Sequence, residues 1–123
     1  MGWPDDYPKI DFKERNLLNN KIDYLESISQ QISELTKLVY QNANIAKKKN
    51  WNIINDKKIS SYPLIRDILI DADFVALDSP WQFEMILKEA KDAIHSQITD
   101  FKMKIKKIND LNKDPNSKWK GWV

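Results

Sequence analysis

The chain has 123 residues, of which 41% are apolar and 31% are charged, a balance typical of a folded helical protein rather than a disordered one. It contains no cysteine, which excludes disulfides and cysteine-ligated zinc or iron–sulfur sites. The net charge is only +2 at pH 7, and no apolar run approaches the roughly 20 residues that cross a membrane. We therefore expect a soluble cytoplasmic protein with no membrane partner.

Glycine occurs only twice, as Gly2 and Gly121. All-β folds and doubly wound α/β folds depend on glycine in turns where φ is positive, so both are disfavoured. We predict an all-α fold, with residues 1–123 forming a single helical domain. It would be a helical bundle of two long helices plus one short helix, with extended aromatic terminal arms.

The first ten residues predict an N-terminal arm. Pro4 and Pro8 each push the preceding residue toward extended geometry, which disfavours a helix there. Residues 1–10 would therefore be an extended arm that carries two aromatic side chains, Trp3 and Tyr7. A frayed terminus is the alternative.

Residues 11–48 predict the first long helix. Asp11 and Glu14 have the spacing of a helix start. Apolar residues then recur at steps of three and four, which places them on one stripe of a helix. The stripe consists of Leu18, Ile22, Leu25, Ile28, Ile32, Leu35 and Val39. Polar residues, Asn42 among them, interrupt the pattern where a pure coiled coil would stay apolar.

A connector is expected after this helix. The consecutive lysines at 47–49 suit the C-terminal end of a helix, where cations are favoured. Asn50, Asn52 and Asn55 supply the turn chemistry that glycine would otherwise provide. The apolar residues between them are expected to pack on the end of the bundle, because leaving them in water is costly.

Residues 63–77 predict the short helix, with Pro63 in its first turn. The apolar residues of this segment fit one broad helical face. Alternate apolar residues from Ile68 to Ala76 would also fit a strand. A single strand has no partner elsewhere in the chain, so the helix is preferred.

Residues 80–112 predict the second long helix. Ser79 suits its N-cap, Pro80 its first position and Gln82 the closing of a capping box. Its apolar stripe consists of Leu87, Ala90, Ile94, Ile98, Phe101, Ile105 and Ile108.

The segment Asn112 to Pro115 would end this helix, leaving residues 113–123 as a C-terminal tail with Trp119 and Trp122. The terminal aromatics either dock over the bundle or anchor a partner. Two narrow apolar stripes and one short helix make a thin core, which favours a homodimer with coiled-coil packing.

No residues gather into a recognisable catalytic or metal-binding pattern. His95 is the only histidine, and we expect it to be an ordinary surface residue. Asp71 and Asp73 have the spacing of a metal-binding pair, but residues two apart on a helix diverge. We therefore expect no catalytic residues, no metal, no cofactor and no enzymatic activity. An enzyme built on His95 and Asp92 is the remote alternative.

Charge is distributed in four alternating blocks. Residues 1–36 carry four basic and seven acidic groups, residues 37–60 six and one, residues 61–100 three and eight, and residues 101–123 seven and two. The two basic blocks lie at the predicted ends of the two long helices. They would merge into one patch if those helices ran parallel, whereas antiparallel helices would place each basic end against an acidic beginning.

The leading functional prediction is a non-enzymatic protein–protein interaction module, such as an assembly, adaptor, inhibitor or immunity-type accessory protein. It would bind another protein, including a second copy of itself, through helical faces and terminal aromatics. Those aromatics are Trp3, Tyr7, Trp119 and Trp122. The alternative is a nucleic-acid-binding accessory protein that uses clustered lysines. Those lysines are Lys47, Lys48, Lys49, Lys102, Lys104, Lys106 and Lys107.

Overall fold

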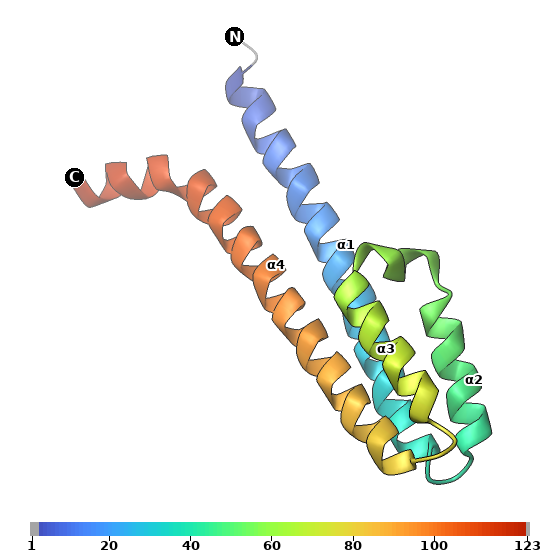
Figure 1. Cartoon of the computed structure of the whole chain (residues 1–123). Helices are drawn as coiled ribbons and strands as arrows, with labels where there is room; N and C mark the ends of the chain where they lie inside the picture. Colours follow the sequence, from blue (N-terminus) through green and yellow to red (C-terminus); the bar gives the residue numbers. More distant parts are fainter. Residues whose placement is uncertain (1–2, 123) are drawn as a thin grey trace. The chain divides into compact units, whose positions relative to one another are not determined.

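The structure is a computed structural model, which describes the backbone of residues 3–122 and the side chains of residues 12–110. The helices follow in the order α1 (Trp3–Leu38), α2 (Ala43–Ile54), the short 3-10 helix η1 (Lys57–Ser61), α3 (Pro63–Val75) and α4 (Pro80–Trp122) (Figure 1). The described backbone contains no strand. The all-α prediction is therefore confirmed.

Both ends of the described backbone are helical, which corrects the prediction of extended terminal arms. Helix α1 begins at Trp3, so Pro4 falls in its first turn, where a missing amide costs nothing. Helix α4 continues past the predicted end at residue 112 to Trp122. Pro115 lies inside it, and Figure 1 shows the helix bending toward its C-terminal end, as a proline within a helix produces.

The predicted helix over 11–48 is two helices, which corrects the count of two long helices and one short one. Helix α1 ends at Leu38, and α2 begins at Ala43 after a turn. Asn42 makes this break, because its extended backbone forms an N-cap and its side chain accepts a hydrogen bond from the Ile45 amide at 3.2 Å. The 47–49 lysines and Asn50 consequently lie inside α2 instead of at a helix end.

Two helices begin at prolines. Helix α3 begins at Pro63 and α4 at Pro80. The Ser79 hydroxyl accepts a hydrogen bond from the Gln82 amide at 3.3 Å, as an N-cap serine does. Helix α3 ends at Val75, two residues before the predicted boundary.

The chain divides into two compact units, and both α1 and α4 contribute to each. Unit 1 comprises Met1–Tyr24 and Ile98–Val123, and unit 2 comprises Leu25–Gln97. In unit 1, Arg15 Nη1 donates to Asn109 Oδ1 at 2.9 Å. Among the side chains of unit 1 that the structure describes, the buried apolar ones are Leu18, Ile22, Ile98, Phe101 and Ile108.

Unit 2 has a core to which every one of its helices contributes. The α1 and α4 segments of this unit run antiparallel, because Ser33 bonds to Lys91 while the later Tyr40 bonds to the earlier Glu84. Its buried apolar residues are Leu25, Ile28, Ile32, Leu35, Val39, Ala46, Ile53, Ile54, Ile59, Ile65, Ile68, Leu69, Ala72, Ala76, Phe83, Leu87, Ala90 and Ile94. The predicted stripes of the two long helices thus supply much of this core.

Candidate functional site

The four aromatic residues predicted to bind a partner lie outside the described side chains. The backbone at all four positions is helical. They are Trp3, Tyr7, Trp119 and Trp122. Their role in binding therefore stays a prediction.

The two lysine clusters belong to different units. Lys47, Lys48 and Lys49 lie in α2 of unit 2. The other cluster lies on the exposed surface of α4 in unit 1 and consists of Lys102, Lys104, Lys106 and Lys107. Within each unit the α1 and α4 segments run antiparallel. The two long helices therefore do not run parallel, which was the first of the two predicted arrangements.

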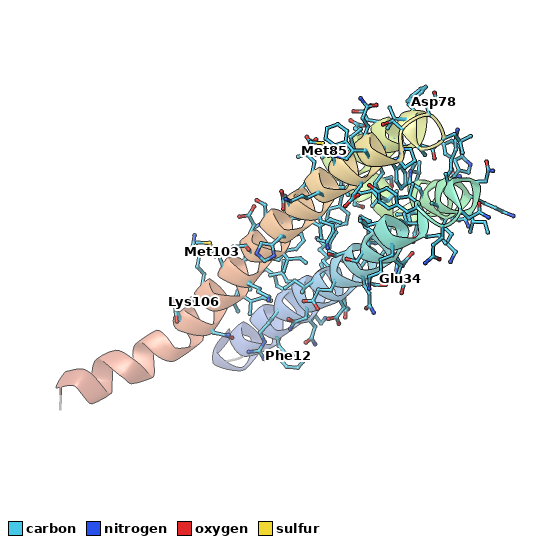
Figure 2. The ribbon with its side chains drawn as sticks, turned by 90° about the horizontal axis from the view of Figure 1, so that it is seen from below. Phe12, Glu34, Asp78, Met85, Met103 and Lys106 are labelled. Atoms are coloured by element: carbon cyan, nitrogen blue, oxygen red, sulfur yellow. The ribbon has the colours of Figure 1, made fainter. Side chains whose placement is uncertain are left out.

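One lysine of the α4 cluster contacts the core of unit 1. The Lys104 ammonium lies 5.8 Å from the centre of the Phe101 ring, and the Lys21 ammonium lies 5.6 Å from it. Such cation–π contacts favour both charges beside the buried ring. Figure 2 shows Met103 and Lys106 extending outward from the same stretch of α4.

The residues weighed as catalytic or metal-binding do not assemble into a site. Within the described part of the chain, no three or more histidine, aspartate or glutamate side chains are placed to hold a metal ion. Asp71 is exposed, whereas Asp73 accepts a hydrogen bond from Asn50 Nδ2 at 3.4 Å. His95 is exposed on α4.

A pair of exposed apolar side chains on α4 is the feature that sequence reasoning missed. Trp81 has 63% of its surface exposed and Met85 has 53%. They are four residues apart and share one face of the helix, opposite the face that buries Phe83 and Leu87. Figure 2 shows Met85 on the outer side of the α4 segment of unit 2.

Trp81 and Met85 line a groove of about 470 Å³ between the α1 and α4 segments of unit 2. We call it the Trp81 groove, and its lining residues are Thr36, Trp81, Glu84, Met85, Lys88 and Lys91. Thr36 comes from α1, where its hydroxyl donates to the Ile32 carbonyl at 3.0 Å, and the others come from α4.

Two of the polar residues that line the Trp81 groove, Glu84 and Lys91, are held by hydrogen bonds from α4 to α1 and to the turn that follows α1. Lys91 Nζ donates to Ser33 Oγ at 2.7 Å, and this hydroxyl in turn donates to the Ser29 carbonyl at 3.2 Å. The Tyr40 hydroxyl donates to the carboxylate of Glu84. Both contacts lie within unit 2 and join the two chain segments that border the groove.

The hydrogen bond from Tyr40 to Glu84 has a measurable consequence. It raises the pKa of the Tyr40 phenol above its ordinary 10.0, and the charge of Glu84 acts in the same direction. The stabilisation from this bond is complete at lower pH and is lost as the pH rises through the folded-state pKa. We expect Glu84→Gln to lower the Tyr40 pKa, as followed by NMR titration of the tyrosine Cζ resonances.

Tyr62 provides the control for this titration, because burial raises its pKa. Its titration should be the same in the wild type and in Glu84→Gln. A variant in which Tyr40 keeps its raised pKa would show that Glu84 does not hold the phenol proton.

A second pocket, of about 420 Å³, combines basic and aromatic residues on α2, and we call it the α2 pocket. It is lined by Asn44, Lys47, Lys48, Trp51 and Asp73. Half of the Trp51 surface is exposed. Its two lysines precede Trp51 by three and four residues, so all three share one helical face.

No family model, no curated protein and no solved structure matches this chain. None of the helices in the described part of the chain combines the length and apolar character needed to cross a membrane. The geometry of the two pockets is therefore the basis for assigning a function.

Proposed function

We propose that this protein is a non-enzymatic interaction module that binds a protein partner in the Trp81 groove. The single observation that carries the proposal is the joint exposure of Trp81 and Met85 in one groove. Leaving apolar surface in water costs about 25 cal/mol per Å², so a partner that covers these side chains gains affinity. Tryptophan and methionine are also enriched in protein interfaces, and tryptophan dominates binding hot spots.

The shape of the groove favours a helical partner. It lies along α4, which supplies Trp81 and Met85, and α1 borders it at Thr36. An amphipathic helix commonly packs its apolar face into a groove beside another helix. An assembly, adaptor, inhibitor or immunity-type role in the cytoplasm would use a surface of this kind.

The test is selection of binders from a displayed library of random helical peptides against the wild-type protein. Replacing Trp81 with serine should weaken the selected peptides at least about thirtyfold, since hot-spot tryptophans contribute about 2 kcal/mol or more. Binding would be measured by fluorescence anisotropy. Light scattering of the same two proteins over a range of concentrations tests whether a second copy of the chain is the partner.

Leu64→Ser is the matched control, because Leu64 is 68% exposed and lies on α3 in the same unit. It also replaces an exposed apolar side chain with serine, but outside the groove, and should leave peptide affinity unchanged. Peptides that bind the wild type and Trp81→Ser equally, or a selection that yields no binders, would contradict the proposal. The four terminal aromatics stay a predicted second contact region.

Nucleic-acid binding is the second candidate function, and the α2 pocket is the observation that favours it. Lys47 and Lys48 lie beside the half-exposed Trp51. Lysines can neutralise phosphates while an aromatic ring stacks on a base, the combination that binds single strands. Asp73 lines the same pocket and opposes a phosphate there, which is why this function ranks second.

A further inference from the structure

We infer that the partner of the Trp81 groove is an acidic amphipathic helix, which places apolar side chains on Trp81 and Met85 and carboxylates on Lys88 and Lys91. This inference rests on the proposed function and adds the chemistry of the partner. Complementary charge is what identifies the occupant, because the groove combines an apolar end with a basic end.

The charged side chains that line the groove differ in how they are already bonded within the chain, and therefore in what they offer to a partner. Lys88 is exposed, and the Lys91 ammonium bonds to the neutral hydroxyl of Ser33. Glu84 is the single acidic residue of the lining, and its carboxylate already accepts the hydrogen bond from Tyr40. A partner carboxylate therefore meets two ammonium groups, each with donors left to offer.

The order of the residues along α4 sets the pattern that a partner must match. Lys88 lies three residues after Met85 and Lys91 six residues after it, or about 4.5 and 9 Å along the helix axis. A helix lying along α4 would thus need an apolar anchor followed by carboxylates about one and two turns away. Spacing of three to four residues on the partner gives this arrangement.

The position of Glu84 argues against a nucleic-acid strand as the occupant. Glu84 lies between Trp81 and Met85 in sequence and lines the same end of the groove. A phosphate backbone carries charge along its whole length, so it would bring phosphates close to this carboxylate. An acidic helix carries charge only where its sequence puts it, so it can meet Glu84 with an apolar surface.

The experiment uses three alanine-rich peptides of about 18 residues, long enough to be partly helical in water. Each carries two leucines one turn apart, followed at one and two turns by glutamate, glutamine or lysine. We expect the glutamate peptide to bind the wild type at least about tenfold more tightly than the lysine peptide at low salt, and the difference to shrink as salt screens the charges. Anisotropy of labelled peptides measures each affinity.

Charge reversal at the groove provides the decisive variant. Lys88→Glu should weaken the glutamate peptide about tenfold and tighten the lysine peptide. Lys48→Glu is the matched control, because it changes the net charge equally at an exposed position of α2 that lines the other pocket. The Lys48→Glu variant should bind each peptide with the same affinity as the wild type.

The outcomes separate this inference from the proposed function. If the three peptides bind equally and Trp81→Ser weakens the binding of all of them, the inference of an acidic partner is wrong. The proposal that the Trp81 groove binds a partner then stands. If none of them binds in a Trp81-dependent way, both proposals are contradicted. If a single-stranded dT oligonucleotide binds in a Trp81-dependent way, the occupant is a nucleic acid and the inference is overturned.

Discussion

Replacing Phe83 with alanine is expected to destabilise the protein by about 3–5 kcal/mol, the usual cost of truncating a buried phenylalanine. Phe83 is fully buried in unit 2 and is among its largest buried side chains. Truncation removes its apolar contacts and leaves a cavity that the surrounding helices fill only in part. Urea unfolding followed by circular dichroism at 222 nm measures the loss, since the midpoint falls while the slope stays constant.

Phe74→Ala is the control for this prediction. Phe74 lies on α3 in the same unit and has 78% of its surface exposed. The same chemical change there should alter stability by no more than about 0.5 kcal/mol, as is usual for surface positions. Equal losses for the two variants would mean that the packing of unit 2 described above is wrong.

Replacing Asn50 with aspartate is expected to cost about 3–5 kcal/mol at neutral pH, as other unpaired buried charges do. Asn50 is fully buried in α2, and its Nδ2 donates to the Leu69 carbonyl at 3.0 Å and to Asp73 at 3.4 Å. Aspartate would replace this donor with a second acceptor and set one carboxylate against another. Protonation in acid removes the added charge, so the loss of stability should shrink as the pH falls.

Two further variants test whether the added buried charge causes the loss of stability in Asn50→Asp. Asn52→Asp adds the same charge at an exposed position of α2 and should change stability by no more than about 0.5 kcal/mol. Asn50→Leu removes the hydrogen bonds without adding charge. It should cost far less than Asn50→Asp, because Asn50 Oδ1 is buried without a partner among the described residues. Chemical unfolding at two pH values that gave Asn50→Asp and Asn52→Asp the same stability would refute this account.

The repetitive parts of the fold could be predicted from the sequence because burial follows helical periodicity. Buried residues recur at steps of three and four along both long helices, namely Leu25, Ile28 and Ile32 on α1 and Leu87, Ala90 and Ile94 on α4. The start of α4 was equally predictable, since Ser79 and Pro80 have strong positional preferences.

The break between α1 and α2 was not predicted because the apolar stripe continues almost without interruption through Val39. The deciding signal is Asn42, which starts a new helix by capping it. Asparagine both caps helices and occupies turns, so propensity alone does not distinguish Asn42 from Asn50. Asn50 lies inside a helix because α3 supplies partners for its side chain, and this tertiary contact overrides its local preference.

The Trp81 groove was missed because a groove depends on how helices from distant parts of the chain come together. Thr36 and Met85 are far apart in sequence but line the same groove. A weaker signal was present, since Trp81 and Met85 fall on the face opposite Leu87. Large apolar residues on that face of α4 indicate a surface available for a partner.

The most direct test of binding in the Trp81 groove is to measure the NMR shifts of the tryptophan indole N–H resonances. The shifts are measured on adding a saturating concentration of a peptide that was selected against the wild type. Trp81→Phe and Trp51→Phe assign the two signals. We predict a large shift of the Trp81 resonance and no shift of the Trp51 resonance, because Trp51 lines the other pocket. A peptide that shifts the Trp51 resonance and leaves the Trp81 resonance unchanged would contradict binding in the Trp81 groove. It would place the binding site in the α2 pocket instead.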